Sequence, residues 1–421
     1  MEAVKVAILT IGDEILYGQT LDTNSHWMSQ ELDDHGFIVT HRTTVGDNEA
    51  DILAGLDTAR EKAPIILITG GLGPTTDDLT KPCLAKYFGV ELVSNPGALT
   101  ELKALFKRLD RELNKSNIAQ TNLPKNADYI SNTMGTAPGI WIEDNGGVFV
   151  SMPGVPYEMK AMMTNHVIPK LMSKYHIPQV EHRIIRTIGI GESWLADKVK
   201  PWEDNLPEHI KLAYLPSLGQ VKMRLTSSGT DKAAIHREFD HLVEQLRQYA
   251  DKYIYGFGDL EIEQVVGEML KEQQLKIGTA ESCTGGYLAH MLTKVPGSSS
   301  YYQGSIIAYA NHVKEAQLGV DRALIEQHGA VSEEVVAAMA KGVCYKLGVD
   351  IGLATSGIAG PDGGTEDKPV GTIWLAVASG GQVETKLLKL FKDRDLNIKM
   401  TAISSIALLW RILQNKPLKN P

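Results

Sequence analysis

The sequence predicts a protein of two α/β domains separated by a small α+β domain. In the first part, strand-like and helix-like segments alternate, and the run "IILIT" at Ile65–Thr69 has the continuous β-branched character of a parallel strand covered on both faces. The middle part follows the order β-α-β-β-α-β, which is typical of split βαβ units. The last part returns to α/β alternation. We therefore expect domains at residues 1–175, 176–257 and 258–421.

Each element is predicted from local periodicity and from glycine and proline punctuation. In the first domain we expect elements at Val4–Ile11, Asn24–His35, Phe37–Val45, Glu49–Lys62, Ile65–Thr69 and Val148–Met152, and a helix to about Tyr175. The middle strands are "RIIRTIGI", "IKLAYLP", "QVKMRLTSSG" and "KYIYGF", and the middle helices are "GESWLADKV" and "DKAAIHREFDHLVEQLRQYA". The last domain has helices at Glu261–Gln274 and Asp395–Leu413 around the strands "KIGTA", "SIIAYA", "IGLATSGI", "GTIWLAVAS" and "VETKLLKLF".

Composition excludes several classes of protein. Hydrophobic residues make up 43% of the 421 residues, and the net charge of -9 argues weakly against a general nucleic-acid binder. The three widely spaced cysteines indicate a reducing compartment rather than a disulfide framework. The N-terminal stretch lacks the pattern of a signal peptide, and no apolar run approaches the roughly 18 residues of a membrane span. We expect a cytoplasmic protein without a membrane partner.

The stretch "TGGLGPTTDD" (Thr69–Asp78) is the first candidate site. A buried strand ends in a glycine-rich loop, and a helix is expected from Leu79. Glycines let the backbone approach a ligand, and a helix N-terminus suits phosphate. Asp77 and Asp78 are placed in the first turn, where carboxylates also serve as caps. A tight turn with capping acids is therefore the competing interpretation, and the loop is not a Walker A motif.

A second acidic loop, "GDEILYGQTLDTNS" (Gly12–Ser25), also follows a strand. Asp13 and Glu14, together with the carboxylates of the first loop, could hold Mg²⁺ against a diphosphate. Asp22 and Asn24 fit helix capping equally well. The small-residue loops "NTMGTAPG" and "MPGVP" add to what looks like a pocket rim, although such loops usually only turn the chain.

The stretch "TAESCTGG" is the second candidate site. A strand, small residues and a helix start resemble a nucleophile turn, although the motif is not G-x-S-x-G. Local position leaves Ser282 and Cys283 as equal candidates for the nucleophile. No Ser/His/Asp set emerges from spacing. Lys314 could act as base if burial lowered its pKa, but most lysines are solvated surface groups.

Taken together, these motifs resemble the CinA family (competence/damage-inducible protein A). Its N-terminal domain is matched by "GGLGPTTDDLT", "GDEILYGQTLDTNS", "NTMGTAPG" and "MPGVPYEM". Its C-terminal domain is matched by "AESCTGG", "GSIIAYANHVKEAQLGV", "TSGIAGPDGG", "PVGTIWLAV" and "DRD". The resemblance covers almost the whole chain, and motifs of this length in this order argue against chance similarity.

The resemblance implies a function for each domain. Residues 1–175 would form a molybdenum-cofactor-biosynthesis-like domain that hydrolyses the diphosphate of ADP-ribose. That activity would need a divalent metal (Mg²⁺, Mn²⁺ or Co²⁺), with K⁺ as an assisting ion. Residues 176–257 would form a KH-like domain. Residues 258–421 would convert nicotinamide mononucleotide and water to nicotinate mononucleotide and ammonia without a cofactor. Family members are typically homodimers.

The resemblance also implies site residues. In the C-terminal domain Ser282 would be the nucleophile, Lys314 the base and Tyr309 an assisting residue. The substrate-binding positions would be Gln303, Thr284, Gly285, Gly286, Ser356, Gly357 and Arg394, with N–H groups of the turn stabilising the oxyanion. In the N-terminal domain the nucleotide- and phosphate-binding positions would be Gly70, Gly71, Gly73, Thr75, Asn24 and Gly135. The metal would be held by Asp77, Asp78, Asp13 and Glu14.

This chain departs from the family pattern near its end. Lys392 stands where the family often has glycine before the Asp-Arg pair, and we expect Lys399 to take the part of a basic residue found a few positions later. Two other interpretations stay open. The N-terminal domain could bind a nucleotide or pterin without turnover, or the chain could be a non-enzymatic adaptor in DNA uptake or damage response.

Overall fold

A computed structural model of the chain describes residues 4–75, 77–177, 179–229 and 231–414. Contacts divide the chain into two compact units. The first comprises residues 1–181 and 227–235, and the second comprises residues 182–226 and 236–421. The first unit holds the N-terminal α/β domain, and the second holds most of the middle domain and the whole C-terminal domain.

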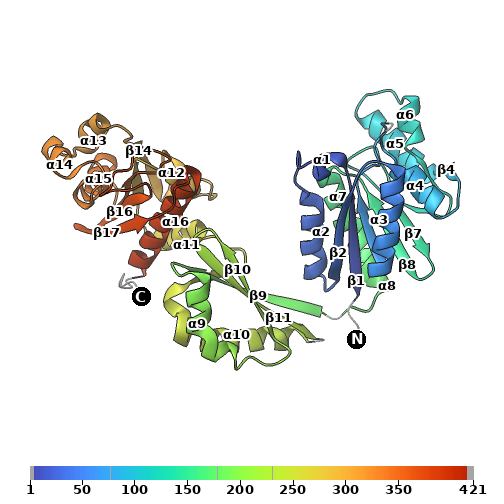
Figure 1. The fold of residues 1–421 in the computed structure, drawn as a ribbon, viewed down its shortest axis with the longest axis horizontal. Helices are drawn as coiled ribbons and strands as arrows, with labels where there is room; N and C mark the ends of the chain where they lie inside the picture. Colours follow the sequence, from blue (N-terminus) through green and yellow to red (C-terminus); the bar gives the residue numbers. More distant parts are fainter. Residues whose placement is uncertain (1–3, 76, 178, 230, 415–421) are drawn as a thin grey trace. The chain divides into compact units, whose positions relative to one another are not determined.

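The N-terminal domain is built on a six-stranded sheet of order β2-β1-β3-β8-β7-β6 (Figure 1). Its strands are β1 (Lys5–Ile11), β2 (Ile38–Val45), β3 (Ile65–Thr69), β6 (Asp128–Ile130), β7 (Gly139–Asp144) and β8 (Gly147–Met152). The pairs β1–β2, β1–β3 and β3–β8 are parallel, whereas β7 runs antiparallel to β8 and to β6. The predicted parallel core is confirmed, and β3 has the predicted bounds.

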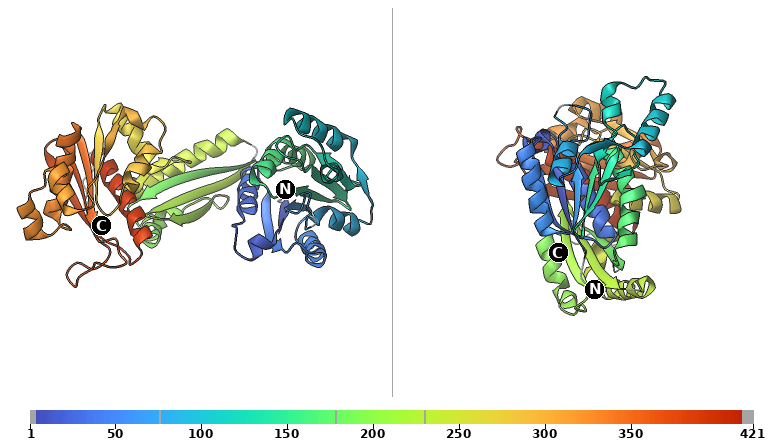
Figure 2. Two further views of the ribbon diagram at one scale, coloured as in Figure 1. Left: turned by 90° about the horizontal axis from the view of Figure 1, so that it is seen from above. Right: turned by 90° about the vertical axis from the view of Figure 1, so that its right-hand side faces the viewer.

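Helices cover both faces of this sheet, as Figures 1 and 2 show. One face packs against α2 (Thr23–Asp34), α7 (Pro156–Met162), a π-helical turn (Met163–Val167) and α8 (Ile168–Lys174). The other face packs against α3 (Glu49–Lys62) and α4 (Thr80–Tyr87). The remaining elements are α1 (Asp13–Leu16), β4 (Leu92–Ser94), α5 (Pro96–Arg108), α6 (Lys115–Ala119) and β5 (Asn122–Pro124). The strand β3 is buried along its whole length, as its continuous apolar sequence predicted.

The middle domain has the predicted β-α-β-β-α-β order. Its elements are β9 (Gln179–Ile188), α9 (Glu192–Glu203), β10 (Lys211–Ser217), β11 (Gln220–Gly229), α10 (Lys232–Ala250), a 3-10 turn (Asp251–Tyr253) and β12 (Ile254–Phe257). The strands form a four-stranded sheet of order β10-β11-β9-β12. The two helices contact each other through Trp202, whose Nε1 donates to the carbonyl of Leu242 at 3.0 Å.

The C-terminal domain has a five-stranded mixed sheet of order β14-β13-β15-β16-β17. Its strands are β13 (Ile277–Glu281), β14 (Tyr302–Ile307), β15 (Ile351–Gly357), β16 (Thr372–Ser379) and β17 (Gln382–Lys389). Its helices are α11 (Ile262–Glu272), α12 (Tyr287–Thr293), α13 (Asn311–Leu318), α14 (Arg322–His328), α15 (Glu333–Leu347) and α16 (Arg394–Leu413), with a 3-10 turn at Ser298–Ser300. Because β13, β14 and β15 are parallel, their carboxyl ends meet at one edge of the sheet.

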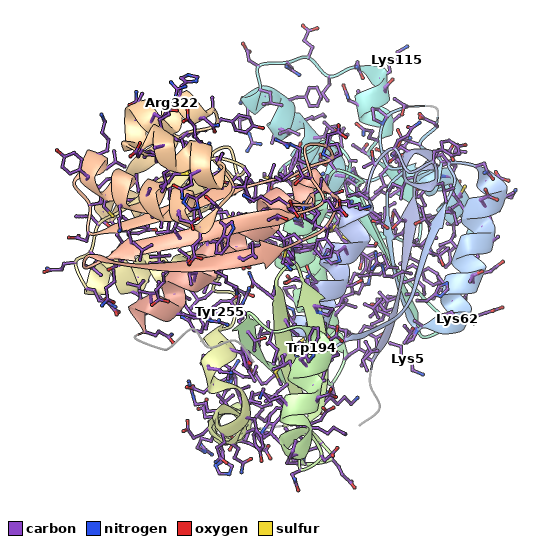
Figure 3. The ribbon with its side chains drawn as sticks, turned by 60° about the vertical axis from the view of Figure 1, so that its left-hand side comes forward. Lys5, Lys62, Lys115, Trp194, Tyr255 and Arg322 are labelled. Atoms are coloured by element: carbon purple, nitrogen blue, oxygen red, sulfur yellow. The ribbon has the colours of Figure 1, made fainter. Side chains whose placement is uncertain are left out.

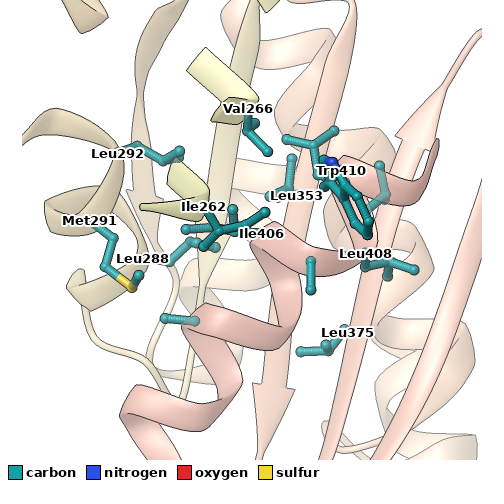
Figure 4. Close-up of a cluster of buried hydrophobic side chains, with 14 of the residues drawn as sticks. Ile262, Val266, Leu288, Met291, Leu292, Leu353, Leu375, Ile406, Leu408 and Trp410 are labelled. Atoms are coloured by element: carbon teal, nitrogen blue, oxygen red, sulfur yellow. The ribbon is translucent and has the colours of Figure 1, made fainter. Parts of the chain in front are cut away.

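The largest core of this domain lies between the sheet and α11, α12 and α16. Figure 4 shows Leu353 and Leu375 of the sheet facing Ile262, Ile406 and Trp410. The helix α16 is long and apolar enough to cross a membrane by length and composition alone. Ile406 and Trp410 are fully buried, however, so α16 has the character of a core helix.

The middle and C-terminal domains share this core. Ile188 of β9 and Tyr255 of β12 belong to the same buried cluster as Trp410. Arg186 of β9 donates to the carbonyl of Gly258 at 2.6 Å and to the Glu261 carboxylate at 2.9 Å. The start of the C-terminal domain is therefore fastened to the middle sheet by both apolar burial and charged hydrogen bonds.

Candidate active sites

Ser282 lies directly after β13, at the carboxyl edge of the C-terminal sheet. Its backbone N–H donates to the carbonyl of Thr355 on the neighbouring strand at 3.0 Å. The chain then turns through Gly285 (φ +59°) and Gly286 (φ +102°) before α12 begins at Tyr287. Both backbone conformations are left-handed, which favours glycine over any other residue. The two glycines therefore permit the sharp turn that leaves Ser282 at the strand end.

The carboxylate of Glu281 holds this turn together from inside the protein. Glu281 is fully buried, and its oxygens accept backbone N–H bonds from Gly286 (2.9 Å), Leu288 (3.1 Å) and Ala289 (2.8 Å). Hydroxyl groups complete its shell, from Thr284 at 2.7 Å and more weakly from Thr279 and Ser305. Among the described residues no cation pairs with it. Its negative charge is instead stabilised by the first N–H groups of α12.

Lys314, on α13, reaches the serine from the neighbouring segment of the chain. Its Nζ lies 3.2 Å from Ser282 Oγ, 2.9 Å from the carbonyl oxygen of Ala308 and 3.2 Å from that of Tyr309. The residue is 1% exposed. Burial lowers the pKa of the Lys314 amine below the ordinary value of a lysine. A neutral amine has two N–H groups, which match the two carbonyls, and one lone pair, which is left for the Ser282 hydroxyl.

Cys283 is a poorer candidate nucleophile than its neighbour in this environment. Its side chain is buried at 5% exposure, and burial raises the pKa of the thiol to about 12. The thiolate is the reactive form of cysteine, so burial keeps this group protonated and inert. Geometry and electrostatics therefore favour Ser282, a choice that local sequence position left open.

A cavity of about 200 Å³ surrounds the serine–lysine pair. It brings together Ser282, Lys314, Tyr309, Ser356, Gly357 and Arg394 of the predicted set. Arg394, the first residue of α16, donates to the carbonyl of Gly360 at 2.7 Å and to the Tyr309 hydroxyl at 3.0 Å. In the described part of the chain it has no carboxylate partner, so its charge is left for an anionic ligand. Ser356 Oγ donates to the carbonyl of Ala330 at 2.7 Å.

Four predicted substrate-binding residues lie outside the lining of this cavity. Gln303 is exposed near the start of β14, at the end of the sheet opposite to Ser282. Thr284 is buried and bonds Glu281 and Thr355, so its side chain supports the turn. Gly285 and Gly286 act through backbone conformation. Their N–H groups are already used, by the Ser282 carbonyl and by Glu281 respectively. Cys283, in contrast, lines the cavity, so its N–H is the candidate donor for an oxyanion.

Asn311, Ala330 and Val331 also line the cavity and were not predicted. Asn311 could have been found, because it opens the helix that carries Lys314 and follows Tyr309 by two residues. Ala330 and Val331 carry no chemical signal in the sequence. Their place in the cavity depends on how the loop before α15 folds.

The N-terminal domain has a cavity of about 390 Å³ at the carboxyl ends of β1 and β3. From the predicted set it is lined by Glu14, Asn24, Gly70, Gly71, Gly73, Asp77 and Asp78. Asp13, Thr75 and Gly135 are not among its lining residues. Asp22, as expected, caps α2 by accepting from the Ser25 N–H at 2.9 Å.

Asp78 organises the glycine-rich loop. One of its oxygens accepts from the Gly73 N–H at 2.8 Å, and the other accepts from the N–H and hydroxyl of Thr75 at 2.8 and 2.5 Å. The helix α4 begins only at Thr80, so the expected placement of Asp77 and Asp78 in its first turn is wrong. The loop folds around the Asp78 carboxylate before the helix starts.

Carboxylates gather at the rim of this cavity. Burial raises the pKa of Asp47, and the nearby charges of Glu14, Asp13 and Asp77 raise it further. Asp47 was not predicted, although it follows β2 as Asp13 follows β1. No three acids meet as a complete ligand set among the residues that the structure describes. Carboxylate oxygens are donors that suit a hard cation, but a cation at this rim would have to take most of its ligands from phosphate and water.

Buried amide groups without partners also face this cavity. Asn24 Nδ2 donates to Thr69 Oγ1 at 3.0 Å and to the Gly154 carbonyl at 2.8 Å, but its Oδ1 has no partner among the described residues. Both polar atoms of the Gln120 side chain are likewise buried and unpaired in this part of the chain. Such groups cost free energy unless a ligand or water pairs with them. Gln120 gave no signal in the sequence.

Gly135 lies against the buried Glu158, one of the lining residues. A Cβ at Gly135 would lie 2.0 Å from Glu158 Oε2, and Asn132 Nδ2 donates to the same oxygen at 2.7 Å. The "NTMGTAPG" loop therefore contributes by enclosing an acid of the cavity wall, and Gly135 serves that close approach.

The fold and the two cavities define a multidomain α/β protein whose sites are compatible with hydrolase chemistry. Comparison with known proteins supports the same division of the chain. Sequence models match residues 7–173 as a probable molybdopterin-binding domain, residues 182–256 as the damage-inducible protein CinA KH domain, and residues 259–413 as the CinA C-terminal domain. The chain belongs to the CinA family.

Relatives match the chain over nearly its whole length. A CinA-like protein of Cytophaga hutchinsonii is 47% identical over 407 residues, which cover 97% of both chains. A CinA-like protein of Salinibacter ruber is 41% identical over 404 residues, 96% of this chain and 98% of the relative. Among solved structures, a CinA protein of unknown function from Thermoplasma acidophilum is 32% identical, covering 41% of this chain and 97% of that chain with a TM-score of 0.36.

The Glu281 shell yields a stability prediction. In Glu281→Gln an amide N–H₂ would face backbone N–H donors, so we expect the free energy of unfolding to fall by roughly 1.5–3 kcal/mol. Glu384→Gln, at an exposed residue of β17, is the matched control and should change it by less than about 0.5 kcal/mol. Urea unfolding measured for both variants tests the difference. Equal stability of the two variants would show that Glu281 does not hold the turn.

Proposed function

We propose that the C-terminal site hydrolyses the carboxamide of nicotinamide mononucleotide to nicotinate mononucleotide and ammonia. The observation that supports this most directly is the contact at 3.2 Å between Ser282 Oγ and the buried Lys314 amine, which makes no ion pair with any described residue. A serine with a desolvated lysine is a nucleophile with its base. The choice of substrate rests on the family resemblance, and the uncompensated charge of Arg394 at the cavity suits the phosphate of a mononucleotide.

The first half of the reaction forms an acyl-enzyme. Ser282 Oγ attacks the carboxamide carbon while neutral Lys314 takes the hydroxyl proton. Cys283 lines the cavity, and its backbone N–H would stabilise the developing oxyanion. The protonated Lys314 then gives its proton to the leaving nitrogen, the C–N bond breaks, and ammonia departs. Lys314 is neutral again at the end of this half.

The second half reverses these roles with water. Lys314 takes a proton from a water molecule, whose oxygen attacks the ester carbon of the acyl-enzyme. The bond to Ser282 Oγ breaks, and Lys314 returns the proton to the serine oxygen. The product is the carboxylic acid, which ionises to nicotinate mononucleotide at neutral pH. No cofactor is needed for either half.

We propose that the N-terminal cavity hydrolyses the diphosphate of ADP-ribose with a divalent metal, with K⁺ as an assisting ion. A bound divalent cation would neutralise phosphate charge. Glu14, Asp47 and Asp77 would hold it, and the loop fixed by Asp78 would place the backbone of Gly70–Gly73 near the phosphates. The unpaired Asn24 and Gln120 side chains would bind polar groups of the substrate. A nucleotide- or pterin-binding domain without turnover is the second candidate, because the same unpaired amides would serve binding alone.

Replacing the nucleophile separates the two neighbouring candidates. In Ser282→Ala we expect ammonia release from nicotinamide mononucleotide to fall by roughly a thousandfold or more. Cys283→Ala should keep most of the activity, and iodoacetamide should inhibit only weakly because the thiol is buried and protonated. An enzymatic ammonia assay on both variants tests this. Retained activity in Ser282→Ala, or loss of activity in Cys283→Ala, would contradict the assignment of Ser282 as the nucleophile.

Activity should also report the protonation state of Lys314. Only the neutral amine can accept the serine proton, so kcat/KM should rise with pH through the pKa of Lys314 in the free enzyme. Burial disfavours the charged amine, which places this rise below the ordinary pKa of lysine. The pH profile of ammonia release measures it, with Lys341→Gln as the surface control. A profile without an ascending limb below that value would contradict the lysine base.

Metal dependence tests the N-terminal proposal. EDTA should abolish ADP-ribose hydrolysis and leave ammonia release unchanged. Asp47→Asn should raise the Mg²⁺ concentration needed for half-maximal activity by roughly tenfold or more, whereas the exposed control Asp34→Asn should not. Hydrolysis that resists EDTA would exclude the metal mechanism. Metal-dependent ligand binding without any turnover would support the binding domain instead.

A further inference from the structure

A third cavity, of about 460 Å³, lies within the second unit and belongs to neither proposed site. One wall comes from the middle domain, namely the turn after β9, the start of α9 and the turn between β10 and β11. The other wall comes from Lys386 of β17, Phe391 and the buried helix α16. Its size is that of a typical small-molecule site.

Two cations face this cavity without a counter-charge. Lys386 and Arg411 both line it, and neither makes an ion pair with any residue in the described part of the chain. Burial lowers the pKa of Lys386, and the nearby charge of Arg411 lowers it further. Burial also lowers the pKa of Arg411. Glu192 is the acid among the described lining residues, and it pairs with neither of them. Two partly buried like charges are costly unless an anion lies between them.

The backbone at Gly189 lies close against the guanidinium of Arg411. Gly189 has φ +78°, and a Cβ there would lie 2.3 Å from Arg411 Nη2. Gln220, only 9% exposed, accepts from the Tyr255 hydroxyl at 2.7 Å through Oε1. The N–H groups of Gln220 Nε2 therefore remain to donate to a ligand in this cavity. The polar wall thus combines an amide donor with two cations.

An exposed aromatic surface borders the same cavity. Trp194, labelled on α9 in Figure 3, is 71% exposed, and Phe391 is 54% exposed. A Cβ at Gly191 would lie 2.7 Å from Trp194 Cε3, so the indole rests on a bare stretch of backbone. Met400 and Ile403 of α16 add apolar surface. Exposed aromatic rings of this kind provide stacking surfaces for planar rings.

We propose that this cavity binds a nucleotide, with its phosphate between Lys386 and Arg411 and its base against Trp194. The uncompensated charge argues for the phosphate, and the aromatic rim argues for a planar base. The ligand would contact the middle and C-terminal domains together, so its binding would strengthen their contact. The proposal does not depend on the chemistry of the other two cavities.

The test titrates the full-length protein with AMP, inorganic phosphate and adenosine in EDTA and measures bound ligand by equilibrium dialysis. AMP should bind more tightly than phosphate or adenosine. Lys386→Gln and Arg411→Gln should each weaken AMP binding by roughly tenfold or more. Trp194→Ala should weaken AMP binding but not phosphate binding. Lys389→Gln, on the opposite face of β17, is the matched control and should change neither.

Thermal unfolding with and without AMP shows whether a variant loses ligand binding or simply folds poorly. Without ligand, the Lys386→Gln and Arg411→Gln variants should be at least as stable as the natural chain, because a repulsion is removed. AMP should raise the Tm of the natural chain and not of these variants. AMP binding that both variants retain would overturn the proposal, as would phosphate binding as tight as that of AMP. A change of oligomeric state in Lys386→Gln would assign the cavity to contact with a second copy and overturn it too.

Discussion

The C-terminal site depends on one buried carboxylate. Glu281 is the last residue of β13, and its oxygens accept hydrogen bonds from the first N–H groups of α12. Ser282 lies in the turn between this strand and this helix. A buried charge is tolerated only where hydrogen bonds replace its hydration. Because that shell comes from the turn itself, the turn cannot relax without exposing the charge to an apolar interior. The same bonds that satisfy Glu281 therefore fix the position of the nucleophile.

The N-terminal loop repeats this solution with a different residue. Asp78 gathers the N–H groups of Gly73 and Thr75 much as Glu281 gathers those of α12. In both domains a carboxylate shapes, from within, a glycine-rich turn that follows a strand. The chemistry is then left to neighbouring side chains, namely Ser282 in one domain and the rim carboxylates in the other. An acid in such a turn is consequently ambiguous in sequence, because a ligand and a scaffold look alike.

The sequence predicted the helices and strands and their order better than the contacts between residues that are distant in the chain. Hydrophobic periodicity and the positions of glycine and proline predicted β3, α3 and the middle β-α-β-β-α-β order, because these elements depend on local burial patterns. The Ser282–Lys314 pair could not be found from spacing, since the parallel pairing of β13 and β14 brings together residues 32 positions apart. The place of Gln303 away from this cavity could not be predicted either, because its position along β14 depends on strand register. Asp47 and Gln120 were missed because an isolated acid or amide gives no signal until the fold surrounds it.

The helix α16 joins features that the sequence presents as unrelated. Arg394 opens it at the serine–lysine cavity, and Arg411 lies near its other end at the third cavity. Seventeen residues of helix span about 25 Å. Ile406 and Trp410, near the end of the helix that carries Arg411, are packed in the core. One core helix therefore carries a cation to each of two separate cavities, so neither arginine can change its place along α16 without disturbing the same buried contacts.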